Sequence, residues 1–187
     1  MRKKKRKLLD NLYTYNQKNG TYEISLSLND YGEIFNTYDY AQFRTRDLDE
    51  EFLNYLYDSN DDIPLKYKVK LIFYIHKEKE DSKRDIAVRK ALKNNIGWKI
   101  KENEKIIMHS IKKCITFFFI GLLFFVLTWV TDGGTRLSKL FYESLVIIEW
   151  VFIWQAIEIL AFGLIDIIQA NRYLKRLVKS DVEFKSY

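Results

Sequence analysis

The sequence of 187 residues has only one cysteine, one proline and two histidines. The single cysteine, Cys114, excludes an intrachain disulfide. Together with His76 and His109 it does not make up a zinc ligand set, so we expect no metal and no cofactor. One proline and seven glycines argue against a disordered chain and against a turn-rich all-β fold.

Sequence motifs typical of enzymes are also absent. The sequence contains no glycine-rich phosphate-binding loop and no nucleophile elbow. Acidic pairs such as Asp61-Asp62 fall in segments that we expect to be exposed turns or helix starts, where carboxylates are solvated or cap a helix. We therefore predict that the protein is not an enzyme.

Charge is absent from the run Cys114–Thr131, about 18 residues rich in Phe, Leu, Ile and Val. A helix that crosses a bilayer needs ~20 apolar residues, with a lower limit of ~17. A soluble helix of this length is rarely apolar on every face. Lys112-Lys113 precede the run and Asp132 follows it. The run predicts a membrane-spanning helix over 114–131.

A second apolar segment would let the chain cross back. Asp132–Thr135 is typical of a turn. Leu137–Trp150 mixes apolar and charged residues and fits either an interfacial segment or the outer turns of the second helix. Trp150–Ile168 is long enough to cross a bilayer. We predict a pre-span helix and a transmembrane hairpin over 102–179, with spans at about 114–131 and 150–168.

Lysine and arginine favour one end of both predicted spans. That end has Lys105, Lys112, Lys113, Arg172, Lys175, Arg176 and Lys179, whereas the loop between the spans has Arg136 and Lys139. Basic residues stay on the cytoplasmic side of membrane proteins. We expect a multi-pass protein of the cell's inner (cytoplasmic) membrane with both termini in the cytoplasm.

Ahead of the spans, residues 21–101 predict a small cytosolic head. Thr21–Leu28 alternates apolar and polar residues, as a half-buried strand does. Lys66–Ile75 begins with the same alternation and then becomes apolar on both faces. Two strands alone make a marginal sheet. A third could come from Trp98–Ile100, from the tyrosine-rich segment 29–46, or from another subunit, which is a reason to expect a homo-oligomer.

Two helices accompany these strands. Asp47 can cap a helix over 48–58, with Glu50 completing a capping box. A second helix is predicted over 81–96, with Gly97 as its end. The fold class is an α+β membrane protein: a β-α-β-α head, then a long helix and a two-helix hairpin.

Basic residues mark both ends of the chain, which we divide into a basic N-terminal arm (1–20) and a C-terminal tail (180–187). A solvated tail is one interpretation, and attraction to anionic lipid headgroups, at ~1 kcal/mol per residue, is the other. We predict headgroup contacts for Lys112, Lys113, Arg172, Lys175 and Arg176. No known module surrounds the basic run, so we do not expect nucleic acid as a partner.

A resemblance supports this architecture. Arg46-Asp47-Leu48, Tyr55, Ile63-Pro64-Leu65 and the strand that follows resemble uncharacterised small prokaryotic membrane proteins. Those proteins look like a compact α/β head ahead of a two-helix hairpin. The resemblance covers most of the chain and implies no activity.

The second predicted span carries polar residues at a helical spacing. At about 100° per residue, Gln155, Glu158, Asp166 and Gln169 form one stripe, with Glu158 ~15 Å inside the bilayer and near its midplane. A carboxylate there must be neutral, paired, or in contact with water or protein. The stripe fits a path for protons or cations, and equally a helix contact through Thr116, Thr128 or another subunit's Gln155. Glu143 and Glu149 are candidates for an outer mouth.

Three functional hypotheses follow. The first is an oligomeric ion-conducting membrane protein gated by its head, which would sense a cytosolic ligand or protein partner. The second is a membrane-anchored interaction or sensing module without transport activity, with a head of residues 2–101 that folds alone. The third is a head that binds a nucleotide or nucleic acid through Lys66, Lys68, Lys70 and the basic N-terminus, although lysines on strands more often face solvent.

Overall fold

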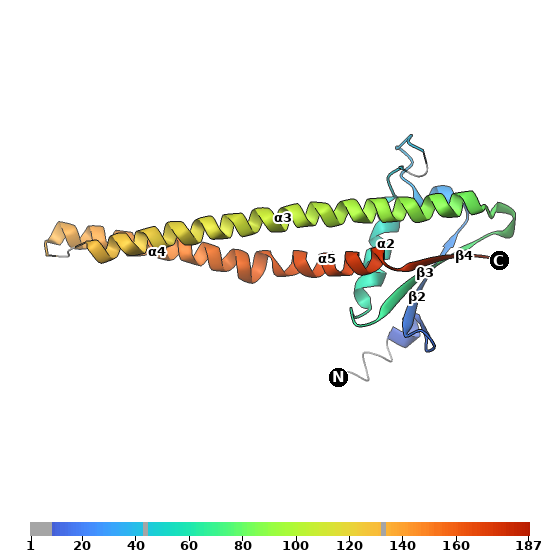
Figure 1. Ribbon diagram of the computed structural model, residues 1–187, viewed down its shortest axis with the longest axis horizontal. Helices are drawn as coiled ribbons and strands as arrows, with labels where there is room; N and C mark the ends of the chain where they lie inside the picture. The colour runs from blue at the N-terminus through green and yellow to red at the C-terminus, as the bar shows by residue number, and fades with distance from the viewer. Residues whose placement is uncertain (1–8, 43–44, 132–133) are drawn as a thin grey trace. The chain divides into compact units, whose positions relative to one another are not determined.

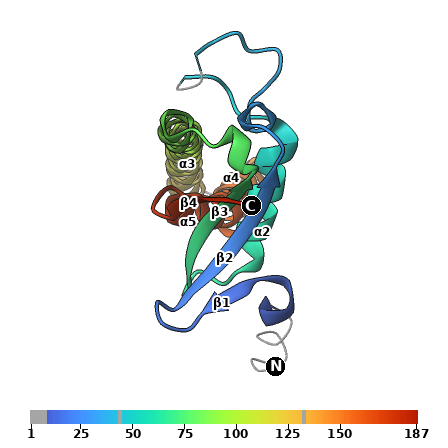
Figure 2. The ribbon, with the colours of Figure 1, turned by 90° about the vertical axis from the view of Figure 1, so that its right-hand side faces the viewer.

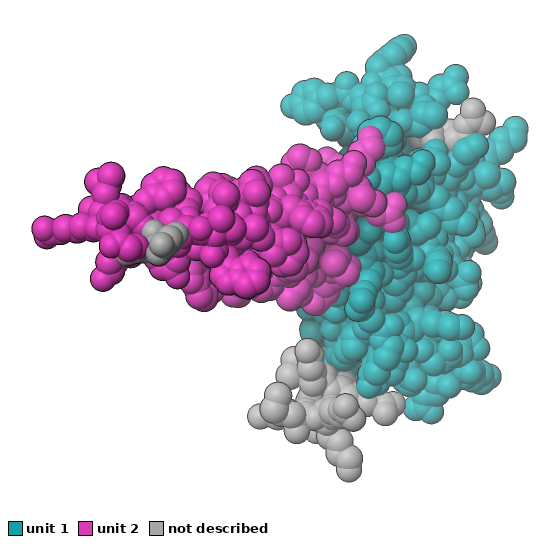
Figure 3. All heavy atoms as spheres, turned by 60° about the vertical axis from the view of Figure 1, so that its left-hand side comes forward, with its two compact units in different colours: residues 1–101, 171–187 teal, residues 102–170 magenta. Residues whose placement is uncertain are grey.

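The computed structural model describes residues 9–42, 45–131 and 134–187. The basic run 1–8 and the centre of the predicted turn, 132–133, lie outside the described residues. The chain has an α+β fold in two compact units (Figure 3). The head consists of Met1–Lys101 and Asn171–Tyr187, and the hairpin consists of Glu102–Ala170. The C-terminal residues therefore belong to the head.

A four-stranded sheet in the order β1-β2-β3-β4 forms the centre of the head (Figure 2). The strands are β1 (Thr14–Asn16), β2 (Thr21–Leu28), β3 (Lys68–Ile75) and β4 (Asp181–Ser186). β1 is antiparallel to β2, whereas β2, β3 and β4 are mutually parallel, with Tyr22 opposite Val69 and Leu71 opposite Val182. The predicted strands 21–28 and 66–75 are confirmed.

The sources proposed for a third strand were wrong. Trp98–Ile100 is helical, and residues 29–46 form no strand in their described part. Instead, the segments taken as arm and tail complete the sheet as β1 and β4. Tyr187 follows β4, and its N–H donates to the Ile75 carbonyl (3.2 Å). The sheet gives no reason to expect a second subunit.

Alternation along the strands gives the sheet two different faces. Val69, Leu71, Phe73 and Ile75 point to one face and are buried, together with Tyr22 and Ile24 of β2. The other face carries Lys70, Tyr74 and Glu183. Ile72 also lies on that second face and is 0% exposed, which confirms that β3 becomes buried on both sides.

One hydrophobic core joins the first face to the helices. Phe52 and Leu56 come from α2, Val88, Leu92 and Ile96 from α3, and Leu174 and Leu177 from α5. Aromatic rings reinforce it: Phe73 stacks on Phe184 of β4 at 5.1 Å between centroids. A tyrosine cluster of Tyr15, Tyr22 and Tyr67 ties β1 and β2 to the start of β3, with centroids 4.7 to 6.0 Å apart.

The connections of the head are helical. Residues 31–34 form η1 (Tyr31–Ile34), and η2 (Lys77–Lys79) follows β3. The Tyr31 hydroxyl donates to Asp85 Oδ1 at 2.5 Å. Burial and this hydrogen bond raise the pKa of Tyr31 to about 12.

The helix predicted over 48–58 is α2 (Glu50–Asp62). Its N-cap is Asp49, which accepts from the Phe52 N–H, and not Asp47 as expected. Asp47 instead pairs its backbone with Asn36, so it belongs to the preceding loop.

The prediction that Gly97 ends a helix was also wrong. α3 (Ser82–Val130) passes through Gly97 without a break and supplies residues to both units (Figure 1). Glycine inside a helix costs only ~1 kcal/mol relative to alanine. Burial of Leu92 and Ile96 on one side of α3 offsets that cost.

The hairpin pairs α3 with α4 (Arg136–Glu158), whose N-cap is Thr135. A π-helical turn, η3 (Ile159–Gly163), separates α4 from α5 (Ile165–Val178). Two helical stretches, Ser82–Val130 and Arg136–Val178, are long and apolar enough to cross a membrane. The segment 137–150 is thus helical and forms the first part of α4.

Candidate functional site

The candidate site is the seam between α3 and α4 inside the hairpin. The Cys114 thiol donates to the Ala156 carbonyl (3.4 Å). The Phe152 ring lies 5.9 Å from those of both Phe117 and Phe124. A Cβ on Gly121 would lie 2.7 Å from Ile153 Cδ1, so only glycine lets the helices approach this closely here.

These contacts define which residues of α3 and α4 lie side by side, at the same level along the length of the hairpin. At 1.5 Å per residue, Glu149 is level with about Leu123, and Glu158 is level with about Cys114. The segment of the second helix opposite 114–131 therefore runs from about 141 to 158, and not over 150–168. Glu158, which we predicted near the bilayer midplane from its position along the second helix alone, is level with Cys114 at one end of the charge-free run 114–131.

Glu149 occupies the middle of the seam. Leu145, Glu149, Phe152 and Ala156 recur every three or four residues, which puts them on the α4 face that meets α3. Leu145 and Ala156 are buried, and Glu149 is half-buried between them. The structure gives its carboxyl no hydrogen-bond partner among the residues that it describes.

Gln155 and Glu158 pair with each other on the outside of the hairpin. Gln155 Nε2 donates to Glu158 Oε2 at 2.7 Å, and the Glu158 side chain is exposed. Thr116 and Thr128, the partners considered for Glu158, donate to carbonyls of their own helix, those of Lys112 and Phe125. The contact of Glu158 is thus within one helix.

The π-helical turn interrupts the expected polar stripe. The Leu164 N–H donates to the Ile159 carbonyl (3.1 Å), five residues back, so one extra residue enters this turn. One extra residue rotates the positions of all later residues about the helix axis by about 100°. Asp166 and Gln169 are exposed, but they do not continue the line of Gln155 and Glu158.

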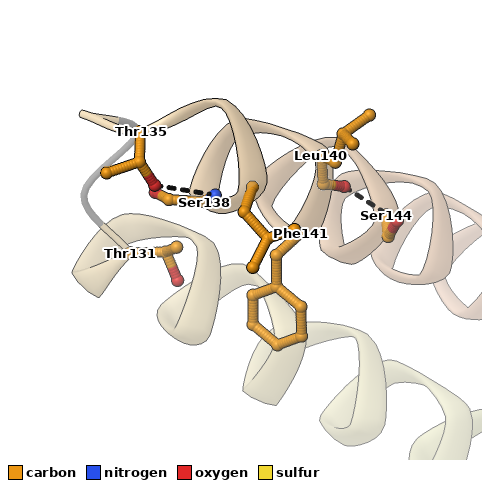
Figure 4. A pocket seen from close by; sticks show the side chains of 7 residues that line it. Thr131, Thr135, Ser138, Leu140, Phe141 and Ser144 are labelled. Carbon is orange, nitrogen blue, oxygen red and sulfur yellow. Dashed lines mark hydrogen bonds between the residues drawn. The ribbon is translucent and has the colours of Figure 1, made fainter.

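Glu143 lies near the far end of the hairpin and is exposed. A shallow hollow in this region is lined by Thr131, Leu137, Phe141 and neighbouring residues (Figure 4). The hydroxyls there bond locally, because Thr135 Oγ1 accepts from the Ser138 N–H (3.2 Å) and Ser144 Oγ donates to the Leu140 carbonyl (2.9 Å). We assign no site to this hollow.

The basic residues predicted to contact headgroups divide into two kinds. Lys112, Lys113, Arg172 and Lys175 are exposed. Arg176, which we also predicted to contact headgroups, instead turns into the head, where its guanidinium hydrogen-bonds to protein groups. Its Nε and Nη2 donate to Asn60 Oδ1 (3.1 and 2.9 Å), and Nη2 also donates to the Asn60 carbonyl.

Nη1 of Arg176 reaches the carbonyls of Ile63 (2.8 Å) and Pro64 (3.0 Å). Arg176 therefore caps the C-terminal end of α2, whose last carbonyls have no partner within the helix. Burial lowers the pKa of its guanidinium, and the nearby Tyr173 and Asp61 oppose that shift. We call these contacts the Arg176 clamp.

The sequence did not lead us to predict the seam between α3 and α4 or the Arg176 clamp. The spacing of Cys114, Phe117, Gly121, Phe124 and Thr128, with steps of three and four, was visible in the sequence and indicates the α3 side of the seam. The same rule would have placed Glu149 in the seam. No sequence signal distinguishes Arg176 from its exposed neighbours Arg172 and Lys175.

Comparison of the chain with protein-family models, with curated proteins and with solved structures finds no match. The resemblance to small prokaryotic membrane proteins therefore stays a prediction.

Proposed function

We propose that this is an integral protein of the cytoplasmic membrane whose hairpins assemble and let protons or other small cations pass. The observation that carries the proposal is the carboxyl group of Glu149, half-buried in the seam and level with the middle of the charge-free run of α3. Ionisable groups at that depth are costly in a bilayer and usually serve ion or proton pathways.

The surface of the hairpin supports a bilayer as its surroundings. Trp129 and Val130 are 86% and 77% exposed, and the exposed fractions of Phe119 and Leu123 are greater than one half. Water-soluble proteins rarely expose so continuous an apolar surface. Lys112 and Lys113, with Arg172 and Lys175, favour the cytoplasm for the head and both termini.

Association of several hairpins would cover polar side chains that a single hairpin leaves partly exposed. A seam of two helices covers only part of Glu149, and the Gln155–Glu158 pair faces outward. Neighbouring hairpins would cover both and add polar groups around the carboxyl, as polar side chains commonly do between membrane helices. The oligomer then forms through the hairpins rather than through the sheet.

The test is ion flux in liposomes that contain the purified full-length protein. Glu149→Gln keeps the size of the side chain but cannot ionise, so we expect proton or cation flux to fall by about ten-fold or more. Glu143→Gln is the matched control, because it removes an exposed carboxyl near the end of the same helix. Equal flux in both variants and in the unmodified protein would refute the role of Glu149, and flux no greater than in empty liposomes would refute conduction.

The alternative is a membrane-anchored interaction or sensing module. It is favoured by the head, which completes its sheet within one chain and is joined to α5 by the Arg176 clamp. This alternative predicts unchanged flux in Glu149→Gln and a folded head that binds a cytosolic ligand or protein. The head cannot be tested as residues 2–101, because these lack β4, Leu174 and Leu177.

A further inference from the structure

A groove on the head is lined by basic side chains from three separate parts of the chain. Lys66 comes from the connection before β3, Lys68 from β3, and Arg172, Lys175 and Lys179 from α5 and the residue after it. The groove has a volume of about 550 Å³. All of its lining residues belong to the head.

Helical spacing gathers the three α5 residues on one side. Positions 172, 175 and 179 are three and four apart, so they fall within about 60° of one another on the helix. Lys68, at the start of β3, lines the same groove. Cations from β3 and from α5 can therefore approach one bound group together.

The charge of the groove is strongly one-sided. Asp181 is the one carboxylate among its lining residues, against Lys66, Lys68, Lys179 and the other cations. No carboxylate in the described part of the chain forms an ion pair with Lys66, Lys68 or Lys179. Lys70, two residues along β3, contrasts with them, because Glu183 neutralises it at 2.7 Å.

Two residues that line the groove, Arg176 and Tyr67, are held by other contacts within the head. The N–H groups of Arg176 are bonded to Asn60, Ile63 and Pro64, so it adds positive charge without being a ligand. Tyr67 is fixed by Tyr15 and Tyr22. The Lys66 ammonium lies 4.6 Å from the Tyr67 ring centroid. A preformed site loses little entropy when it binds.

We propose that this groove binds the phosphate group of a phosphorylated ligand. Several lysines and an arginine around one hollow match a phosphate, whose oxygens accept several charge-assisted hydrogen bonds. The volume leaves room for a small organic part against Leu65 and Tyr67. The phosphate could belong to an anionic lipid headgroup or to a soluble phosphate ester.

Basic clusters next to a membrane attract anionic lipids, which makes a headgroup one source. Arg172 lies 14 residues beyond Glu158, the residue level with Cys114 at the start of the charge-free run, so a soluble phosphate ester is equally compatible with the position of the groove in the chain. The inference does not depend on conduction, since binding is measured without ion flux.

The experiment uses full-length protein purified in detergent and stripped of lipid. In one arm, glycerol 3-phosphate and inorganic phosphate are titrated by calorimetry. In the other, the protein is placed in bilayer discs of phosphatidylcholine with or without phosphatidylglycerol, and retained lipid is counted by native mass spectrometry. The test variant is Lys68→Gln with Lys179→Gln. The control is Lys90→Gln with Lys93→Gln, two exposed lysines of α3 outside this groove.

Each lysine beside a phosphate contributes about five-fold in affinity, so we expect about 25-fold weaker binding in the test variant and little change in the control. Loss in the soluble arm identifies a phosphate ester, and loss in the lipid arm alone identifies a headgroup. The proposal is overturned if neither probe saturates, or if the control weakens binding as much. A test variant that does not unfold cooperatively is replaced by Lys66→Gln with Arg172→Gln.

Discussion

The head and the hairpin use apolar side chains in opposite ways. In the head, Leu71, Phe73 and Ile75 are covered by helices of the same unit, while polar residues such as Lys70 and Glu183 remain outside. In the hairpin, the apolar residues Phe119, Leu123 and Trp129 are outside, and the carboxyl of Glu149 is in the seam. This difference agrees with the proposed location of the hairpin in a bilayer and of the head in water, since a unit exposes the side chains that its surroundings tolerate.

The two units also differ in what holds their parts together. The head combines a buried core with directional bonds, above all those of the Arg176 clamp. The described contacts of the seam are mainly close packing, as at Gly121 and Phe152. Stability of the head should therefore depend on specific polar groups, and that of the hairpin on the shape of its side chains.

The largest effect is expected from Arg176→Ala. It removes the donor of the Ile63 carbonyl and of Asn60 Oδ1, and one of the two donors of the Asn60 and Pro64 carbonyls, which costs about 3 kcal/mol of the free energy of unfolding of the head. Thermal unfolding of the full chain in detergent measures it. Arg172→Ala, on an exposed side chain one turn earlier, should change stability by less than about 0.5 kcal/mol. Similar losses in both variants would show that the clamp adds nothing.

A smaller effect, confined to the other unit, is expected from Gly121→Leu. Its Cβ would meet Ile153 at 2.7 Å, so the helices must separate, at a cost of about 1–3 kcal/mol. Labelling of the buried thiol of Cys114 by a maleimide should become faster, while the unfolding of the head stays unchanged. Gly163→Leu is the control, because a Cβ there meets nothing within 4 Å. Equal labelling in both variants would contradict the described seam.

The smallest effect concerns the open face of the sheet. The hydrogen bond from Lys70, followed by its charge and that of Lys185, lowers the pKa of Glu183 from its ordinary value of 4.5. A lowered folded-state pKa stabilises the head at neutral pH, and this contribution disappears as the pH falls below about 4.5.

Solvent screens this half-exposed pair, so about 0.5 kcal/mol is expected. The melting temperature of Glu183→Gln should be lower than that of the unmodified protein at pH 7, and the two should converge in acid. A gap that persists at low pH would mean that the carboxylate is not responsible.

Local patterns predicted the parts of the fold that depend on neighbours in sequence. β2 was predicted at its observed bounds because Tyr22, Ile24, Leu26 and Leu28 alternate with polar residues. β4 was not, because Val182 and Phe184 give only a short alternation and its partner β3 lies more than 100 residues earlier. The glycine signal at Gly97 failed because packing of Ile96 outweighs a weak helix propensity.

The candidate site was predicted by residue type but not by position. Glu149 was assigned to an outer mouth and Glu158 to the midplane, because each helix was read separately. Depth depends on how two helices align, and contacts such as Cys114–Ala156 and Phe117–Phe152 provide that alignment. The π-helical turn at Ile159–Gly163 has no clear signal in the sequence and shifts Asp166 off the stripe.

The position of β4 in the chain has a consequence for synthesis. The strand that closes the sheet is translated after both apolar helices, so the head cannot finish folding while the ribosome is still making them. Until Asp181–Ser186 is synthesised, the edge of β3 that later pairs with β4 stays without a partner strand. Both apolar helices thus leave the ribosome before the head can mature.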